Sequence, residues 1–307
     1  MYSLLLFVFI QALTGLAMVY ALQLVISIHW AVHEGIITYN LMTSVERILK
    51  FSNLPEEPGY KTRAKPISAW PVKAACEFRN VTDGSDTLQN LSFVLRPKEK
   101  VAILGREGEK SAILSTLFHL SRPKGRIIID NIDILNLNIQ FLRSSISVIF
   151  REPFLFSGKL RTNLDPTEKF KDFQLWKALE TVQLKTFIES LPGQLYYNVT
   201  DNKDIFSTSQ KQLINLARTL LEGNKILVLY DALVNVDQET CELIQDIIRR
   251  KFRDATVLSL TNRLDTIVDF HRVMILDKGK IVEFEPPEYL LQRDSIFSHL
   301  YYNHHSD

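Results

Sequence analysis

The sequence predicts an α/β domain with a mainly parallel core sheet, preceded by one membrane-spanning helix. Three observations lead to this fold class. Short runs of β-forming residues alternate with helical patterns after about residue 72. A glycine-containing loop at residues 105–111 joins one of these strands to a helix, and residues 1–33 contain no Asp, Glu, Lys or Arg. The strand, loop and helix have the outline of a phosphate-binding loop, because backbone N–H groups at such a turn can surround a phosphate.

The N-terminal apolar segment is longer than the roughly 20 residues that cross a bilayer. A signal peptide is disfavoured because the start is not basic, the apolar run is too long and no small-residue cleavage site follows. A buried helix of a soluble protein is the remaining alternative. Five basic residues between positions 47 and 65 follow the segment and none precedes it. By the positive-inside tendency, the remainder of the chain is expected to be cytosolic.

Three regions are expected along the chain. Residues 1–51 form the membrane helix and its extension, residues 52–71 a proline-rich linker, and residues 72–307 the α/β domain. Prolines in the linker prevent the helix from continuing. Strands are expected at residues 76–81, 88–95, 101–104, 126–130, 146–150, 225–229, 256–260 and 272–276, a hairpin turn at residues 278–280, and helices from residue 113, at 210–221 and at 239–252.

Composition disfavours several classes of function. The formal net charge of +1 gives no reason to expect a nucleic-acid partner. The two cysteines, Cys76 and Cys241, lie far apart without metal-ligand spacing, which fits a reduced cytosolic setting. A chain of 307 residues, 46% of them hydrophobic, can bury one large domain or a domain with an appendage.

Four further stretches resemble motifs of one family. Residues 155–166 are similar to the segment after the Q-loop of the multidrug-resistance-associated proteins, the C subfamily of the ABC transporters. Residues 206–218 look like that subfamily's signature motif and its helix, and residues 225–237 like its Walker B strand and D-loop. Residues 41–47 resemble the exit of its last transmembrane helix into the second nucleotide-binding domain. The resemblance covers nearly the entire chain, in order.

This resemblance implies an ABC-type P-loop nucleotide-binding domain with a mainly parallel core sheet, an antiparallel β subdomain and a helical subdomain. It implies ATP and Mg²⁺ as cofactors, and a second ABC cassette, further transmembrane helices and the lipid membrane as partners. Each ATP site of the family combines the Walker motifs of one cassette with the signature motif of the other. The usual cargo is an amphipathic organic anion, and a plasma-membrane location is expected. One membrane helix cannot enclose a pathway, so the chain is expected to need partner chains or to be a fragment.

The resemblance also assigns roles to individual residues. The expected nucleotide-binding positions are Gly105, Gly108, Lys110 and Ser111 in the phosphate loop, Arg151 in the Q-loop, Ser207 and Gln210 in the signature motif, and Asp237 in the D-loop. Ser111 and Asp231 are the expected magnesium positions, and Asp231 and Asn262 the expected catalytic positions. For Lys110 and Ser111, an ordinary helix start is an equally good interpretation.

The Walker positions lack residue types that the chemistry needs. Glu109 stands where the pattern has glycine, and the loop is one residue short. A carboxylate about 4 Å from a phosphate oxygen costs about 4 kcal/mol at an effective dielectric constant of 20. Tyr230 and Asp231 replace the Asp-Glu pair that follows the Walker B strand. A neutral phenol offers a metal no charge, and Asp231 is one methylene shorter than the expected glutamate.

The other motifs are altered as well. Arg151 replaces the Q-loop glutamine and can neither accept a hydrogen bond nor ligate a cation; an ion pair with the neighbouring glutamate is the alternative. Asn262 replaces the switch histidine, and Ser209 replaces the signature glycine. No aromatic residue follows the first strand to stack on adenine, and the nearest candidates are Tyr60 and Trp70.

Two functions are consistent with these residues. One is a transport ATPase that hydrolyses ATP with a partner cassette, supported by the surviving Gly105, Lys110, Ser111 and Asp237. The other is a non-hydrolysing pseudo-cassette, either a structural or regulatory adaptor or the product of a decaying gene. It is supported by the simultaneous changes in the loop, Walker B, Q-loop, signature and switch motifs. We predict that the fold persists and that hydrolysis by this cassette is weak or absent.

Overall fold

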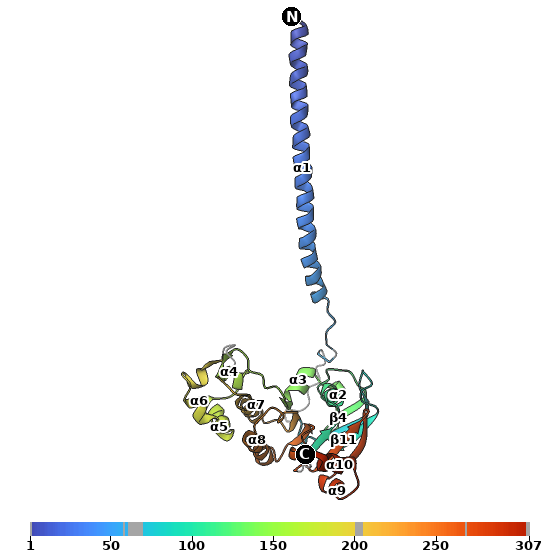
Figure 1. Cartoon of the computed structure of the whole chain (residues 1–307), viewed down its shortest axis with the longest axis vertical. Coiled ribbons are helices and arrows are strands. Elements are labelled where there is room, and N and C mark those ends of the chain that lie inside the picture. The colour runs from blue at the N-terminus through green and yellow to red at the C-terminus, as the bar shows by residue number, and fades with distance from the viewer. Residues whose placement is uncertain (1, 58, 61–69, 200–204, 268, 305–307) are drawn as a thin grey trace. The chain divides into compact units, whose positions relative to one another are not determined.

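The computed structural model describes residues 2–57, 59–60, 70–199, 205–267 and 269–304, which form two compact units (Figure 1). The first unit is dominated by α1 (Tyr2–Ser52), one uninterrupted helix of 51 residues. From Phe7 onward its large apolar side chains are exposed, and the segment from Phe7 to Ser52 is long and apolar enough to cross a membrane. A helix that is apolar all round needs lipid or other helices to cover it.

The second unit, called here the cassette, is built on a six-stranded sheet. Its strand order is β12-β11-β3-β10-β9-β6. The strands are β3 (Lys100–Leu104), β6 (Ile146–Phe150), β9 (Ile226–Tyr230), β10 (Thr256–Leu260), β11 (Arg272–Asp277) and β12 (Lys280–Glu285). All neighbours pair in parallel except β11 and β12. The predicted strands of this sheet are confirmed to within two residues, because their nearly continuous apolar sequences suit strands buried on both faces.

A four-stranded antiparallel sheet packs beside the main sheet. Its order is β2-β1-β4-β5, formed by β1 (Cys76–Thr82), β2 (Leu91–Leu95), β4 (Lys124–Ile129) and β5 (Ile132–Asp133). Strand β2 begins three residues later than predicted. The buried carboxylate of Asp83 accepts a hydrogen bond from the backbone N–H of Leu88 at 2.6 Å, which folds this stretch into a turn. This sheet shares one apolar core with α2 (Glu107–Leu117) and one face of the main sheet.

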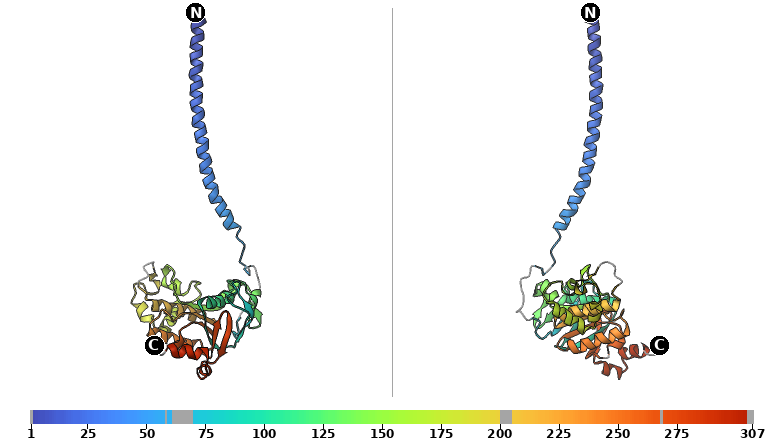
Figure 2. Two further views of the ribbon diagram at one scale, coloured as in Figure 1. Left: turned by 45° about the vertical axis from the view of Figure 1, so that its right-hand side comes forward. Right: turned by 90° about the vertical axis from the view of Figure 1, so that its left-hand side faces the viewer.

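Helices cover the other face of the main sheet. A second apolar core lies under α7 (Thr208–Glu222), α8 (Gln238–Lys251) and α5 (Asp172–Thr181). A third lies under α9 (Pro287–Leu291) and α10 (Ile296–His304). The shorter elements are α3 (Ile139–Ser144), α4 (Leu160–Leu164), α6 (Lys185–Glu189), β7 (Gly158–Lys159), β8 (Asn198–Val199) and the 3₁₀ turns η1 (Ile134–Asn136), η2 (Gln194–Tyr196) and η3 (Leu264–Thr266). Figure 2 shows the helical part gathered on one side of the cassette and the two large sheets on the other.

The predicted hairpin turn between β11 and β12 is confirmed and has a close backbone contact. Gly279 has a φ of 75°, in the left-handed region that favours glycine. A Cβ atom at this position would lie 2.2 Å from the carbonyl oxygen of Thr87. The turn therefore fits against the loop before β2 only with glycine.

We expect Gly279→Ala to lower the free energy of unfolding by roughly 2–3 kcal/mol, because the added methyl group meets backbone at a strained φ. Chemical denaturation of the full chain in lipid nanodiscs measures the effect. Gly84→Ala is the matched control, because a Cβ atom there has nothing within 4 Å. Equal stability of the two variants would contradict the close contact.

Candidate nucleotide site

The topology brings the predicted site residues to one edge of the main sheet. Gly105 follows β3, Arg151 follows β6, Asp231 follows β9, and Asn262 lies two residues beyond β10. These strands are parallel and adjacent, so their carboxyl ends meet at the same edge. Ligands of open α/β sheets bind at this edge.

The glycine loop is helical for most of its length. Helix α2 begins at Glu107, so Gly108, Lys110 and Ser111 lie in its first turns. The expected helix start at residue 113 is therefore six residues too late. A shortened loop leaves only Gly105 and Arg106 between β3 and α2. The carboxylate of Glu109 caps the helix by accepting a hydrogen bond from the backbone N–H of Arg106 at 2.8 Å.

Four of the six backbone N–H groups from Gly105 to Lys110 are already bonded within the chain. The N–H of Gly105 donates to Asn262 Oδ1 at 3.4 Å, and that of Arg106 donates to Glu109. The N–H groups of Glu109 and Lys110 both donate to the carbonyl oxygen of Arg106, at 3.0 and 3.1 Å. An anion at a helix N-terminus needs free N–H groups, and four of those between Gly105 and Lys110 are engaged within the chain.

Glu109 occupies the helix N-terminus as an internal anion. Its side chain is buried, with 2% of the residue exposed. While Oε2 caps α2, Oε1 accepts a hydrogen bond from the backbone N–H of Gly279 at 2.7 Å. The negative carboxylate also lies at the positive end of the helix dipole. The carboxylate of Glu109 therefore lies at the helix N-terminus, a position that suits a bound phosphate.

Lys110 is bound by two carboxylates. Only 1% of its side chain is exposed, and Nζ lies 2.5 Å from Asp231 Oδ2 and 3.1 Å from Glu107 Oε2. The side chain of Asp231 is also buried, with 4% exposed. The ion pair therefore fixes α2 to the end of β9. The lysine predicted to bind phosphate and the aspartate predicted to bind magnesium form an ion pair with each other in this structure.

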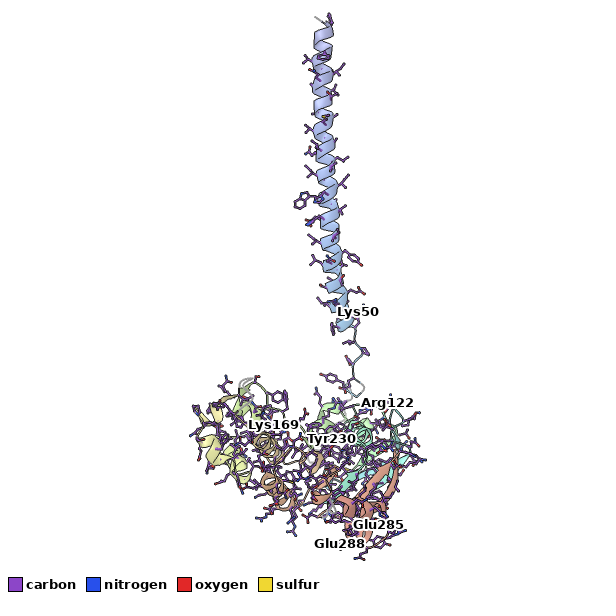
Figure 3. The ribbon with its side chains drawn as sticks, in the orientation of Figure 1. Lys50, Arg122, Lys169, Tyr230, Glu285 and Glu288 are labelled. Carbon is purple, nitrogen blue, oxygen red and sulfur yellow. The ribbon has the colours of Figure 1, made fainter. Side chains whose placement is uncertain are left out.

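Tyr230 extends this arrangement, which we call the carboxylate–lysine cluster: Glu107, Lys110, Tyr230 and Asp231. The hydroxyl of Tyr230 donates to Glu107 Oε1 in a short hydrogen bond. That bond lowers the pKa of Glu107, and burial followed by the same bond raises the pKa of Tyr230. The phenol stays protonated as a donor and the carboxylate stays charged as its acceptor. Figure 3 draws Tyr230 in the middle of the cassette.

Ser111 does not extend toward the cluster. Its hydroxyl donates to the carbonyl oxygen of Gly108 at 3.0 Å, which is a bond within the first turns of α2. Among the described residues, no group of three or more His, Cys, Asp or Glu is placed to hold a metal ion. The geometry thus favours the interpretation of Ser111 as part of an ordinary helix start.

The signature residues cap their own helix. Ser207 Oγ accepts from the N–H of Gln210 at 3.1 Å, and Gln210 Oε1 accepts from the N–H of Ser207 at 3.0 Å. Ser209, at the position of the family's glycine, donates from its hydroxyl to Asp237 Oδ1 in a short hydrogen bond. Asp237 also caps α8 by accepting from the N–H of Thr240 at 2.9 Å. The signature motif and the D-loop of this chain are therefore joined to each other.

Among the described residues, the remaining candidates make no hydrogen bond or ion pair with the cluster. Arg151 and Glu152 are both exposed, and no ion pair joins them in the part of the chain that the structure describes. Trp70 is buried, with its indole N–H donating to the carbonyl oxygen of Ile129 at 3.2 Å, so it is not an open platform for adenine. Tyr60 is exposed, and its carbonyl oxygen accepts a hydrogen bond from Asn138.

Sequence reasoning missed two residues that organise this edge. Glu107 falls within the predicted glycine-containing loop without a role of its own, because its role depends on Tyr230, which is 123 residues away. Gln212 is 1% exposed, and its amide donates to the carbonyl oxygens of Phe150 at 2.8 Å and Ala232 at 2.6 Å. In the sequence, Gln212 stands at one of the positions of the amphipathic helix α7 that otherwise carry buried apolar residues, and this could have identified it. Gln212 joins the ends of β6 and β9.

Comparison with known proteins agrees with this arrangement of motifs. Residues 88–234 match the family described as ABC transporter. The chain carries an ABC transporter domain. It is 41% identical over 290 residues to ATP-binding cassette sub-family C member 4 of Mus musculus and of Homo sapiens, an alignment that covers 92% of this chain and 22% of each relative. The predicted resemblance to the C subfamily is confirmed.

Two further similarities bear on the domain. The vacuolar heme ABC transmembrane exporter abc3 of Schizosaccharomyces pombe is 37% identical over 294 residues, covering 93% of this chain and 20% of the relative. The solved structure of a bacterial Atm1-family ABC exporter with ATP bound superposes with a TM-score of 0.79 at 25% identity, covering 87% of this chain and 48% of that one. The chain thus spans about a fifth of the length of these curated relatives, and the predicted ABC-type fold is confirmed.

ABC transporter domains generally bind ATP with Mg²⁺. The residues of this ABC domain do not fit that ligand in the arrangement described. Lys110 has two carboxylate partners, the carboxylate of Glu109 holds the helix N-terminus, and the hydroxyl of Ser111 is bonded within its helix. A triphosphate would have to displace internal anions before it could make its own contacts.

Breaking the buried ion pair should destabilise the domain. We expect Lys110→Met to lower the free energy of unfolding by about 3–5 kcal/mol, because it leaves the buried Asp231 carboxylate without its cation. Adding Asp231→Asn should recover part of the loss. Denaturation of the full chain measures both variants. Lys98→Met, which breaks the exposed pair with Asp254, should cost much less and serves as the control. A loss equal to that of the control would show that the Lys110 pair is not buried in solution.

The hydrogen bond from Ser209 to Asp237 should be measurable through the pKa of the Asp237 carboxyl group. The hydrogen bond from Ser209, followed by those from Thr240, lowers the pKa of Asp237 to about 2. Because this pKa is lowered by folding, its contribution to stability is present above the ordinary value of 3.8 and is lost as the pH falls toward 2.

We expect Ser209→Gly to raise the pKa of Asp237 toward its ordinary value. Carbon-13 NMR of the labelled aspartate carboxyls of the full chain measures the shift. Thr208→Ala changes the neighbouring residue and should leave the pKa unchanged. An unchanged pKa in Ser209→Gly would mean that the serine does not hold this carboxylate.

Proposed function

We propose that this chain is a membrane-anchored part of a C-subfamily-type ABC exporter, and that its cassette is closed to nucleotide by its own side chains. In this proposal it acts as a non-hydrolysing structural partner of a second cassette. The observation that carries the proposal is the engagement of Lys110 by Asp231 and Glu107. The lysine on which phosphate binding depends is held inside the chain by a residue that occupies the Walker B position.

The local charge supports closure. Lys110 is held by the carboxylates of Glu107 and Asp231, and the carboxylate of Glu109 lies at the start of the same helix, whereas Arg106 at this edge is paired with Asp277. A polyphosphate that approached Lys110 would compete with the two carboxylates that already hold it. Drawing Lys110 toward a phosphate would also leave Asp231 buried without its partner, which costs several kcal/mol. Both effects oppose ATP binding by this cassette.

The catalytic positions support the absence of hydrolysis. In the family, a Walker B glutamate orients the attacking water, and Asp231 at that position is bonded to Lys110 instead. Asn262 accepts a hydrogen bond from the N–H of Gly105 and so contacts the start of the loop. Phosphoryl transfer depends almost entirely on positioning and charge neutralisation, and the engaged Asp231 carboxylate is not available for these tasks.

The transport part of the proposal rests on the relatives. The mouse and human relatives are C-subfamily proteins, and the fission yeast relative is named as an exporter. We propose that further transmembrane helices and a second cassette complete the assembly, that its cargo is an amphipathic organic anion and that it lies in the plasma membrane. The fission yeast relative is named for the vacuole, so microscopy of the tagged chain, with organelle markers, tests the location.

The alternative is a working transport ATPase. It is favoured by the complete fold and by the retention of Lys110 and Ser111, which would contact nucleotide if the cluster opened. The two functions differ in one measurable property, which is the affinity of the cassette for Mg-ATP.

The full chain in lipid nanodiscs is titrated with Mg-ATP while phosphate release is followed. We expect no saturable binding below about 5 mM and no release above that of empty nanodiscs, because binding must break the Lys110 ion pair. A dissociation constant for Mg-ATP below about 1 mM, or release of phosphate, would overturn the proposal that the cassette is closed to nucleotide and would favour the transport ATPase.

Variants that restore the family's residues test which substitutions prevent ATP binding. Tyr230→Asp with Asp231→Glu restores the Walker B acids but leaves Glu109 at the helix N-terminus. Adding Glu109→Gly should increase the affinity for Mg-ATP at least about tenfold over that double variant, because it removes an anion from the phosphate position. If the double variant alone binds as tightly as the triple variant, Glu109 is not an obstacle.

A further inference from the structure

A second group of charges lies at the edge of the main sheet opposite to the nucleotide edge. Strands β3, β9 and β10 run in parallel, so their first residues meet at one edge and their last residues at the other. An exposed cation stands shortly before each strand: Lys98 before β3, Lys225 before β9 and Arg253 before β10. Nothing in the proposed function makes use of these cations.

A buried threonine joins the segments that carry them. Thr256, the first residue of β10, is 1% exposed. Its backbone N–H donates to the carbonyl oxygen of Lys225 at 2.8 Å, and its hydroxyl accepts from the backbone N–H of Lys98 at 3.1 Å. The same hydroxyl donates to the carbonyl oxygen of Ala74 at 2.8 Å, which brings the exposed Lys73 to this edge. We call the four cations the basic edge: Lys73, Lys98, Lys225 and Arg253.

Most cations of the basic edge have no carboxylate partner. Asp254 pairs with Lys98 at 2.5 Å, and the other three cations form no ion pair in the described part of the chain. Lys225 Nζ donates to a neutral group instead, the carbonyl oxygen of Val72, at 2.7 Å. The hydrogen bond from Lys98 lowers the pKa of Asp254, and the charges of Arg253 and Lys225 lower it further. These two cations therefore lie close enough to act on the carboxylate without being neutralised by it.

The other carboxylates at this edge are bonded elsewhere. Asp130 accepts hydrogen bonds from three consecutive backbone N–H groups before β1, at 2.8 to 3.1 Å. Glu222 accepts from the hydroxyl of Ser147 at 2.5 Å. The buried Glu99 is paired with Arg272 at 2.6 Å, so these two charges offset each other. None of the three carboxylates pairs with a cation of the basic edge among the residues that the structure describes.

The basic edge therefore keeps an excess of positive charge. Two further exposed cations lie beside it in the sequence, Arg96 near Lys98 and Lys251 near Arg253. Six cations then stand against three carboxylates, those of Asp130, Glu222 and Asp254. A group of like charges that the chain does not neutralise attracts a partner of opposite charge and steers its approach.

We propose that the basic edge binds an acidic segment of a partner protein. Carboxylates of that segment pair with Lys225 and Arg253, and an apolar side chain lies against Val72, which is 58% exposed next to Lys73. Charge complementarity of this kind gives a protein interface its specificity and its rate of association. The basic edge is opposite to the nucleotide edge, so the proposal stands whether or not the cassette binds ATP.

A nucleic acid suits this surface less well. The four cations and Val72 offer no aromatic ring on which bases could stack. Asp254 also lies among the cations, where it would meet a polymer that carries a phosphate on every unit. A protein segment can instead place a neutral residue opposite Asp254.

The probe is a fluorescein-labelled peptide with a leucine between two short runs of glutamate. It is titrated with the full chain in phosphatidylcholine nanodiscs while fluorescence anisotropy is followed, with empty nanodiscs as the background. We expect saturable binding with a Kd on the order of 0.1 mM at low salt, weakened at least about fivefold at about 0.3 M salt because the charges are exposed. The same peptide with glutamine in place of glutamate should bind at least about tenfold more weakly.

Three results would overturn the proposal. They are absence of binding by the glutamate peptide, equal binding by the glutamine peptide, and tighter binding by a labelled single-stranded oligonucleotide of the same net charge. The last result would assign the edge to nucleic acid.

Substitutions test the location of binding. Lys225→Gln with Arg253→Gln should weaken binding of the glutamate peptide at least about tenfold, whereas Lys177→Gln with Lys280→Gln, at exposed lysines of α5 and β12, should not change it. Asp254→Asn removes a carboxylate from the edge and should strengthen binding at least about threefold, a gain that a folding defect cannot produce. Unchanged affinity in the first double variant, or binding no tighter in Asp254→Asn, would sink the assignment.

Discussion

The buried ion pair between Lys110 and Asp231 is the interaction on which the edge of the main sheet depends. It joins the first turns of α2 to the residue that follows β9, and both side chains are almost wholly removed from water. A buried ion pair adds little net stability over apolar residues of the same size, but loss of either partner is costly. Its main effect is therefore on conformation, because it allows only arrangements in which α2 and the end of β9 stay together.

The conformation of the glycine loop follows from this constraint. With Lys110 drawn to Asp231 and with one residue fewer in the loop, α2 begins at Glu107 rather than later. Glu109 then reaches the helix N-terminus and the turn between β11 and β12. In a phosphate loop, the bound nucleotide supplies the charge that organises the glycines. Here carboxylates of the chain supply it, which explains how the fold persists although the ligand-binding residues have changed.

The fold was predictable from the sequence, whereas the state of the site was not. Strands such as residues 146–150 and 256–260 are mainly apolar on both faces, and this pattern depends only on neighbouring residues. The substitutions at Glu109, Tyr230 and Asp231 were also visible in the motifs. What they do in the structure was not, because the bond from Gly279 to Glu109 joins residues 170 positions apart and the Lys110 ion pair joins residues 121 positions apart. Trp70 shows the same limit: its burial against the carbonyl of Ile129 depends on a strand that lies 59 residues further along.

The length of α1 has a mechanical consequence. At 1.5 Å per residue its 51 residues extend about 77 Å, whereas the hydrocarbon core of a bilayer is about 30 Å thick and takes up roughly 20 of them. The first charged residue is Glu34, and residues 34–52 continue the helix for about 28 Å without a proline or a break. Gly35 is the one glycine in that stretch, and a Cβ atom there would meet nothing within 4 Å, so it marks no close packing. If the apolar part crosses a membrane, as we propose, a tilt of that part would be carried along the uninterrupted helix to residue 52.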